Sequence, residues 1–398
     1  MHQLAELQLV HLPALSHIPA AAWDQLVGPD SPMLNHAWLN ALEETGCVGG
    51  RTGWLPKHIA VFHGDRLVAA MPVYLKSHSM GELLYDFSWA SSLEAQGYPY
   101  YPKLIVANPF TPITSAKFLT HPELTEDETD LCQRKLLVGL HEALEQTGAR
   151  SLHLHFLPEQ EVAIAQRFGF THHLSAQYHW MRGEAQTFED FLGTVRSKTR
   201  REIRRERKNL KARGYTVEAV EGTDVSDELI CRIYDFYIAT YAKFGWGAGH
   251  LNLAFFRRVR EQMPQHLKLF LAFDPDKNLI GGTFNLQSGN ALYGRYWGAV
   301  EEVPFLHFET CLYTMIEHAL ANGFDRIEPG QGGEHKLARG YQPREMHSAH
   351  WFNHPHVQAA MDRALGRARE SHLEVMHEMR QMSHITAFAA ETSSSDDD

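Results

Sequence analysis

The chain contains 398 residues, of which 44% are hydrophobic, 21% charged and 11% aromatic, and its formal net charge is −11. This length predicts about two or three domains of a globular protein. The acidic balance argues against general binding to nucleic acid or to an anionic membrane, and no apolar run approaches the roughly 20 residues of a membrane-spanning helix.

The N-terminal segment and the cysteines both bear on the cellular compartment. Residues 1–23 contain neither a basic stretch nor a sustained apolar stretch, so we expect no signal peptide. The four cysteines are scattered and form no CxxC pair, which indicates a reducing compartment and argues against disulfides or a thiolate zinc site. We therefore predict a cytoplasmic protein.

Strand and helix patterns alternate through the first half of the chain. Residues 59–75 form a predicted hairpin, and an aromatic-rich loop follows over 82–101. The helical pattern of residues 126–147 precedes an alternating strand at 151–157 and a short helix at 162–168.

The second half begins with a long predicted helix over residues 188–213. Further helices are predicted at 227–241, 253–263, 306–322 and 357–382, and strands at 215–220, 268–287 (a hairpin), 291–299, 324–329 and 348–353. A glycine-rich loop, residues 329–333, follows the strand at 324–329.

The helix at 188–213 contains a strongly basic segment. Residues 196–213 carry ten lysines and arginines against two glutamates. A solvated face is the ordinary interpretation of charged helices, but this excess is one-sided. We therefore interpret the segment as a surface for a phosphate-bearing ligand or for tRNA, with a small phosphate favoured over tRNA.

The two halves share one order of elements. In each, a hairpin precedes a strand, a helix, a second strand and a glycine–aromatic pair, which is Gly169–Phe170 in the first half and Gly340–Tyr341 in the second. This internal repeat resembles two tandem GNAT-like (acyl-CoA N-acyltransferase-like) domains and predicts an α/β (α+β) fold with a C-terminal helix. The predicted parts are an N-terminal domain at 1–185, a C-terminal domain carrying the site at 186–356, an amphipathic helix at 357–390 and a disordered acidic tail at 391–398.

Three motifs in the second half carry a closer resemblance. They are LYGRYWGA at 292–299, LHFE at 306–309 and GQGGEHKLARGYQP at 330–343. These motifs resemble the FemAB-like group of the GNAT superfamily, whose members are described as predicted N-acyltransferases or peptidoglycan biosynthesis/recognition proteins, and the similarity runs over about residues 1–360.

The resemblance implies transfer of an acyl or aminoacyl group to an amine acceptor. It leaves two donors open, acyl-CoA and aminoacyl-tRNA, so no cofactor is certain. Where GNAT enzymes carry a glycine-rich pyrophosphate loop, residues 301–306 contain two acids, one proline and no glycine. Close approach to a pyrophosphate needs glycine, and carboxylates repel the anion, so this loop departs from the CoA-binding pattern.

Charged side chains beside the glycine-rich loop form the predicted site. Acyl transfer to an amine requires a base, a group that stabilises the oxyanion and groups that hold the donor. The candidate catalytic residues are His335, Glu334, His307 and Glu309, and the candidate substrate-binding residues are Arg295, Tyr296, Glu328, Gln331, Lys336, Arg339, Lys243 and Trp246.

Two of these candidates also have structural interpretations. Glu309 lies in the first turn of a predicted helix, where the helix dipole favours an acid. Arg295 can pair with Glu328 across neighbouring strands as a structural ion pair.

The histidines do not predict a metal site. His153 and His155 share one face of a strand, and we interpret them as satisfied or solvent-facing. The C-terminal set, His347, His350, His354 and His356, begins on a strand-like piece, where positions three apart face opposite sides.

We therefore predict an N-acyltransferase that acts on a small-molecule amine. A non-catalytic module that recognises a peptidoglycan-like or nucleotide-linked ligand is the alternative, and a metal-dependent enzyme built on the histidines is a third hypothesis.

Overall fold

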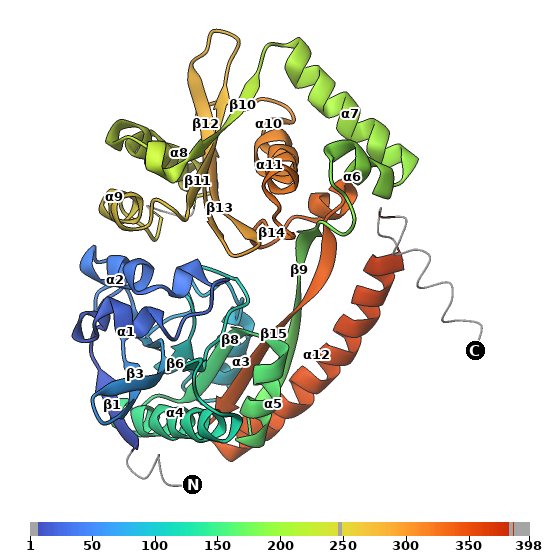
Figure 1. The fold of residues 1–398 in the computed structure, drawn as a ribbon. Coiled ribbons are helices and arrows are strands. Elements are labelled where there is room, and N and C mark those ends of the chain that lie inside the picture. Colours follow the sequence, from blue (N-terminus) through green and yellow to red (C-terminus); the bar gives the residue numbers. More distant parts are fainter. Residues whose placement is uncertain (1–6, 246–248, 382–384, 386–398) are drawn as a thin grey trace. The chain divides into compact units, whose positions relative to one another are not determined.

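The computed structural model describes residues 7–245, 249–381 and 385, so Trp246 and the predicted tail at 391–398 lie outside the described residues. The chain divides into two compact units (Figure 1). Unit 1 comprises Met1–Ser175 and Glu345–His372, and unit 2 comprises Ala176–Arg344 and Leu373–Asp398. The chain thus leaves unit 1 within one strand and returns to it within another.

The strands of unit 1 follow the orders β1-β3-β4-β7 and β15-β8-β6-β5-β2. Strands β6 and β8 are parallel, and β8 pairs with the returning strand β15 in antiparallel register. The strands are β1 (Leu7–Leu12), β2 (Trp54–Pro56), β3 (His58–His63), β4 (Arg66–Met71), β5 (Val73–Lys76), β6 (Lys103–Val106), β7 (Leu119–Thr120), β8 (Ser151–Leu157), β9 (Thr171–Met181, shared with unit 2) and β15 (Gln342–Phe352, also shared).

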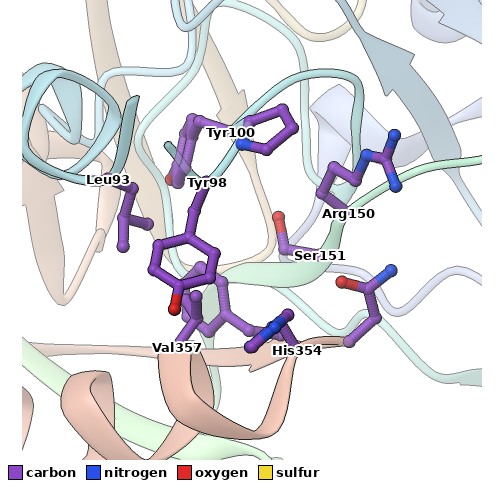
Figure 2. Close-up of a pocket in the computed structure, with 10 residues that line it drawn as sticks. Leu93, Tyr98, Tyr100, Arg150, Ser151, His354 and Val357 are labelled. Carbon is purple, nitrogen blue, oxygen red and sulfur yellow. The ribbon is translucent and has the colours of Figure 1, made fainter. Parts of the chain in front are cut away.

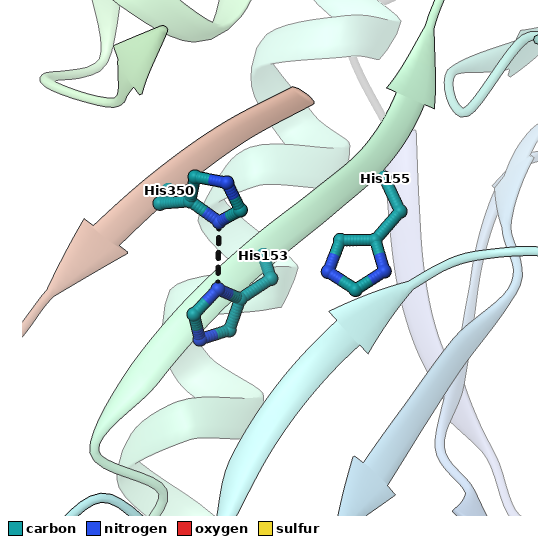
Figure 3. A group of neighbouring side chains, drawn as sticks. All are labelled: His153, His155 and His350. Carbon is teal, nitrogen blue, oxygen red and sulfur yellow. Dashed lines mark hydrogen bonds between the residues drawn. The ribbon is translucent and has the colours of Figure 1, made fainter. Parts of the chain in front are cut away.

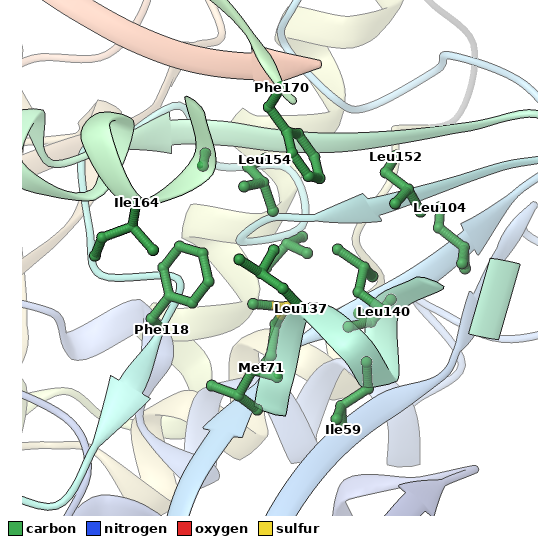
Figure 4. Close-up of a cluster of buried hydrophobic side chains, with 14 of the residues drawn as sticks. Ile59, Met71, Leu104, Phe118, Leu137, Leu140, Leu152, Leu154, Ile164 and Phe170 are labelled. Carbon is green, nitrogen blue, oxygen red and sulfur yellow. The ribbon is translucent and has the colours of Figure 1, made fainter. Parts of the chain in front are cut away.

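Helix α4 (Glu126–Thr147) supplies one side of the core of unit 1 (Figure 4). Its start is fixed by a capping box between Thr125 and Glu128, and its end by Gly148 in the left-handed conformation. Leu137 and Leu140 of this helix lie in one buried cluster with residues of strands β3, β4, β6 and β8. Burial of this apolar stripe, rather than helix propensity, holds the helix in place.

The other helices of unit 1 include one that the sequence did not predict. Helix α3 (Phe87–Ala95) lies within the segment predicted to be a loop, and that prediction was wrong. The helix has little amphipathic pattern, but Ala90 and Leu93 pack into a buried cluster with residues from the far end of the chain. The remaining helices are α1 (Ala20–Asp24), α2 (His36–Glu44), α5 (Glu159–Arg167) and α12 (Pro355–Gln381), which runs on into unit 2.

The strands of unit 2 follow the order β10-β11-β12-β13-β14-β9. All neighbours are antiparallel except β13 and β14. The strands are β10 (Thr216–Glu221), β11 (Leu267–Phe273), β12 (Leu279–Ser288), β13 (Ala291–Ala299) and β14 (Arg326–Glu328).

The basic helix of unit 2 is separate from the helix before it. The sequence predicted one continuous helix over 188–213, and this was wrong: α6 (Phe188–Thr194) ends where Val195 and Arg196 are extended, and α7 (Ser197–Ala212) follows. The guanidinium of Arg200 donates hydrogen bonds to the carbonyl oxygens of Leu192 and Val195, at 2.6 and 3.2 Å. These bonds satisfy carbonyl groups that the end of α6 leaves open.

The predicted helix at 306–322 is interrupted. It consists of α10 (Leu306–Phe308), a π-helical turn at Glu309–Tyr313 and α11 (Thr314–Asn322). The remaining helices of unit 2 are α8 (Asp227–Lys243), α9 (Leu253–Gln262) and a 3₁₀ helix at Glu334–Arg339. Within the described ranges, no helix combines the length and the hydropathy that a bilayer crossing requires.

Candidate functional site

The site of unit 2 forms where two parallel strands separate. Strand β13 pairs with β14 only from Ala291 to Tyr293, opposite Arg326 to Glu328. Beyond this point β13 continues to Ala299, whereas β14 ends and its chain turns away into the glycine-rich loop. The backbone polar groups and side chains that follow the last paired residues therefore face a shared opening rather than a neighbouring strand.

A pocket of about 1050 Å³ lies at this opening. Its walls come from the end of α8, strands β12 and β13, residues 299–307, the π-helical turn and the loop at 329–336. The structure brings together seven of the sequence-predicted residues as lining of this pocket: Lys243, Arg295, Tyr296, His307, Gln331, His335 and Lys336.

Lys336 is the buried cation of this pocket. Its ammonium group donates a 2.8 Å hydrogen bond to the carbonyl oxygen of Gly330. Burial lowers the pKa of Lys336 to about 8. Of two smaller effects, that of Cys311 raises this pKa and that of Arg295 lowers it. The side chain is therefore mostly charged at neutral pH, and its positive charge faces a partly desolvated space where an anion is bound more strongly than in water.

Two neutral imidazoles lie beside this cation. Desolvation lowers the pKa of His307 to about 4, and desolvation followed by Lys336 and Arg339 lowers the pKa of His335. The two ring centroids are 5.6 Å apart. Nε2 of His335 is buried and has no hydrogen-bond partner among the described residues. A neutral ring nitrogen in this state can accept a proton.

Glu309 is held in an ion-pair network outside the pocket lining. Its carboxylate accepts hydrogen bonds from Arg207 of α7 at 2.9 to 3.1 Å, and the same guanidinium binds Glu317 at 2.7 and 2.8 Å. This geometry ties α7 to the interrupted helix at 306–322. It gives Glu309 a structural partner that the sequence interpretation as a base did not include.

Arg339 is also engaged by α7. Its guanidinium binds Glu206 at 2.8 Å and lies 3.5 Å from the ring centroid of Phe308. Glu206 is buried and accepts a second hydrogen bond, 2.5 Å long, from the hydroxyl of Tyr313. These contacts give Arg339 a structural role that needs no substrate, because the buried carboxylate of Glu206 requires a cation and hydrogen-bond donors.

The two remaining acids of the prediction have different surroundings. Glu328 is buried and accepts a 3.0 Å hydrogen bond from Arg326 of the same strand. Glu334 is exposed at the start of the 3₁₀ helix. Neither residue lines the pocket, so the structure does not bring them together with Lys336.

Residues 301–306, whose sequence departs from the CoA-binding pattern, form part of the pocket wall. Glu301, Glu302, Val303 and Pro304 line it, and the carboxylate of Glu302 forms an ion pair with Lys243. Both side chains of this pair are largely exposed, so the pair lies at the pocket's solvent side. The predicted ligand contact Lys243 is therefore partly neutralised by the loop itself.

The sequence interpretation missed several polar or sulfur-bearing residues of the lining, among them Thr283, Asn285 and Cys311. Thr283 and Asn285 are buried on β12, and the amide of Asn285 donates to the hydroxyl of Thr283 at 2.6 Å. Polar residues two apart in an apolar strand were the signal available for them. Cys311 also lines the pocket, but burial raises the pKa of its thiol far above the ordinary value. It therefore carries no thiolate for nucleophilic attack at neutral pH.

Unit 1 has a much smaller pocket. It has a volume of about 80 Å³, and Tyr98, Tyr100, Arg150 and His354 lie around it (Figure 2). This volume suits a few water molecules or a small group, whereas the pocket of unit 2 has the size of a ligand site.

Comparisons with known proteins bear on the whole chain. The profile of the FemAB-like family, described as peptidoglycan biosynthesis/recognition, matches residues 14–387. No curated protein matches the chain.

Solved structures show the fold. The chain is similar to the crystal structure of FemX, with 13% identity and a TM-score of 0.51, over 86% of this chain and 96% of that chain. It is also similar to L-PGS from Bacillus licheniformis, with 12% identity, a TM-score of 0.49 and coverage of 82% and 95%. A tandem GNAT protein from the clavulanic acid biosynthesis pathway has 13% identity, a TM-score of 0.46 and coverage of 88% and 99%.

These findings confirm the predicted α/β (α+β) fold class, which the chain shares with FemX, and the C-terminal helix. They also confirm the family resemblance that the three motifs of the second half carried. The match covers nearly the whole chain, and the chain belongs to the FemAB-like family.

Proposed function

We propose that the protein is an N-acyltransferase that transfers an acyl or aminoacyl group to an amine at the pocket of unit 2. One observation carries the proposal: the neutral imidazoles of His307 and His335 and the buried cation Lys336 line the same ligand-sized pocket. The family membership is consistent with this chemistry.

His335 acts as the base in this proposal. The amine nitrogen of the acceptor attacks the carbonyl carbon of the donor, and the proton that the nitrogen loses passes to Nε2 of His335. That atom is buried and has no hydrogen-bond partner among the described residues, so it is an available acceptor. When the tetrahedral intermediate collapses, the bond between the carbonyl carbon and the leaving group breaks, and the leaving group takes up the proton that His335 received.

Lys336 stabilises the negative charge that develops on the donor. Its ammonium group is fixed by Gly330 and loses little freedom when the oxyanion forms. Arg295 lies two residues beyond the last residue of β13 that pairs with β14, and its guanidinium is near Gly330, so it is suited to a carboxylate or phosphate of one substrate.

The donor in this proposal carries phosphate, as both acyl-CoA and aminoacyl-tRNA do. Helix α7 supports this assignment, although Arg200, Arg204 and Arg207 are committed to partners within unit 2. The remaining basic residues include an exposed stripe at helical spacing, formed by Lys198, Arg201, Arg205 and Lys208. A row of four cations along one helix face suits a chain of phosphates better than a single one.

The test offers labelled acyl-CoAs and charged tRNAs, each with a panel of amines, to the full-length protein. We expect transfer with one donor class, and a rate that falls by about 10²–10⁴-fold in His335→Gln and strongly in Lys336→Met. The control is His347→Gln, which removes a half-buried histidine of unit 1. Equal rates in the wild type and both pocket variants would place the chemistry elsewhere.

A recognition module without turnover is the second candidate. The ion pair between Glu302 and Lys243 favours it, since residues 301–306 correspond to the pyrophosphate loop that the resemblance to GNAT enzymes implies, and the pair engages a carboxylate of this segment. Saturable binding of a donor analogue that requires Lys336, together with no transfer from any donor, would support recognition and contradict the transferase.

A further inference from the structure

Three buried histidines of unit 1 lie together (Figure 3). His153 and His155 project from one face of β8, and His350 lies on β15 directly opposite His153 in the ladder. All three side chains have an exposed fraction of 0%. One potential ligand nitrogen from each of them lies within 4.8 Å of the other two.

Two of these histidines belong to a hydrogen-bonded chain. Nδ1 of His153 and Nδ1 of His350 are 2.7 Å apart, a contact that needs one shared proton. The chain continues from Nε2 of His153 to the hydroxyl of Ser151 at 2.7 Å, and from Nε2 of His350 to Nδ1 of His173 at 3.2 Å. His153 and His350 are therefore oriented by partners behind them, as the ligands of a metal site usually are.

The third histidine has no such explanation. Both ring nitrogens of His155 are buried and lack a hydrogen-bond partner among the described residues. Burying an imidazole in this state costs free energy, and a buried polar group without a partner calls for an unseen water or ion. His155 does lie beside the two histidines that share a proton (Figure 3).

The surroundings of His155 are acidic and polar. Oε2 of Glu82 lies 3.9 Å from Nε2 of His155, and Oε1 of Glu82 is buried without a hydrogen-bond partner among the described residues. The nearby ammonium group of Lys103 is bound by Glu82 at 2.8 Å and also by Asp86. Lys76 interacts with the same two carboxylates, so the acids and lysines of this interior balance one another, and Glu82 is the carboxylate beside His155.

We propose that His153, His155 and His350 form a binding site for a divalent transition-metal ion of the zinc type. Imidazole nitrogens are ligands that such ions prefer, and Zn–N bonds of about 2.0–2.1 Å place tetrahedral ligands a little over 3 Å apart. Small movements of the three rings bring them to that spacing. The ion replaces the proton shared by the two Nδ1 atoms and gives His155 its missing partner.

The site is structural. Because all three ligands are fully buried, the ion has no open path to a large substrate, and its effect is to fasten the returning strand β15 to β8. Glu82 is placed to supply the fourth ligand by a small shift of its carboxylate.

The experiment measures zinc bound to the full-length chain, purified with a tag that contains no histidine. After equilibrium dialysis against a zinc buffer, mass spectrometry gives the metal content. We expect about one ion per chain in the wild type and less than a tenth of that in His155→Leu. The matched control is His347→Gln, which removes a histidine of the same strand that pairs with His172 at 3.0 Å and should keep the ion.

Thermal unfolding provides a second test, because the metal changes the effect of His155→Leu on the melting temperature. Without a metal, His155→Leu removes an unpartnered buried imidazole and leaves the melting temperature unchanged or higher. With the metal, the same substitution lowers it, and a chelator lowers that of the wild type but not of the variant. A wild-type chain that retains no zinc, or a His155→Leu chain that retains as much as wild type, would overturn the proposal.

Discussion

Single residues of the pocket differ in what holds them. Lys336 is fixed by one carbonyl group and faces the pocket, whereas Glu309 and Arg339 are held by charged partners on α7. A residue whose charge has no charged partner is available to a ligand, and one that completes an ion pair is needed for stability. This difference separates the proposed working residues from the supporting ones.

The pH dependence of the activity should report the charge of Lys336. Burial lowers the pKa of Lys336 to about 8, so the proposed oxyanion partner loses its charge as pH rises through that value. We expect kcat/KM to fall by about tenfold per unit above it. In Lys336→Arg the guanidinium stays charged, so the fall should disappear from this range even if the rate is lower throughout. An unchanged descending limb in Lys336→Arg would assign it to another group.

The same shift has a consequence for stability. The pKa of Lys336 is lower in the folded chain than in the unfolded chain, so the unfolded chain binds more protons between the two values. The contribution of Lys336 to the free energy of unfolding therefore rises with pH from about 8 to its ordinary pKa near 10.4. Activity and this part of stability change in opposite directions over that range.

At the scale of elements, helix α7 has two roles: one side is an exposed basic surface, and the other stabilises neighbouring elements through ion pairs. Its exposed stripe faces solvent, while Arg207 on its other side binds the helix at 306–322 and Glu206 binds Arg339 of the 3₁₀ helix at Glu334–Arg339. Positions 203, 206, 207 and 210 recur at helical spacing, which places this set on one side. The helix thus fixes the element that carries His307.

Arg207→Met should destabilise unit 2. It leaves the carboxylates of Glu309 and Glu317 close together without their cation, which costs about 1–3 kcal/mol of the free energy of unfolding. Urea unfolding measures this loss. The control on the same helix is Arg204→Met, whose partner Glu189 is exposed, and it should leave stability nearly unchanged. Equal effects of the two substitutions would show that the network does not brace the site.

From the sequence we could predict several residues that line the pocket, but not the ion pairs that hold the surrounding elements in place. Arg295, His335 and Lys336 stand out because charged residues beside glycines at a strand end have few structural uses. Glu309 and Arg339 look the same in sequence, since their partners on α7 are more than a hundred residues away. The break between α6 and α7 also depends on tertiary contacts of Arg200 that no local pattern records.

The buried histidines of unit 1 also depend on contacts between residues far apart in the sequence. His153 and His155 were interpreted as satisfied or solvent-facing; both are buried, and His155 lacks a hydrogen-bond partner among the described residues. Their neighbour His350 is almost two hundred residues away, so the prediction could not include it.

At the scale of the whole molecule, charge is distributed unevenly. The chain has a net charge of −11, yet four exposed cations follow one face of α7. The net negative charge repels polyanions, whereas this stripe attracts them, so binding there is oriented as well as attractive.

Binding of tRNA, if it uses the stripe, should depend on salt in a defined way. Four contacts to phosphates of RNA give a slope of about −3 in a plot of log K against log salt concentration. The double variant Arg201→Glu and Arg205→Glu should weaken binding and flatten the slope by about half. Filter binding at several salt concentrations measures both. The control is Arg232→Glu on α8, and an equal loss there would show that only overall charge matters.

The return of the chain to unit 1 has a consequence for how the protein is made. Strand β8 receives its partner β15 only from residues 342–352, after residues 176–341, which form most of unit 2, have been synthesised. Until then, one edge of β8 lacks its hydrogen-bonded partner strand, and His153 and His155 of β8 lack the neighbouring His350. Unit 1 is begun first but becomes complete only after most of unit 2 has been synthesised, so folding within that part of unit 2 can precede the completion of unit 1.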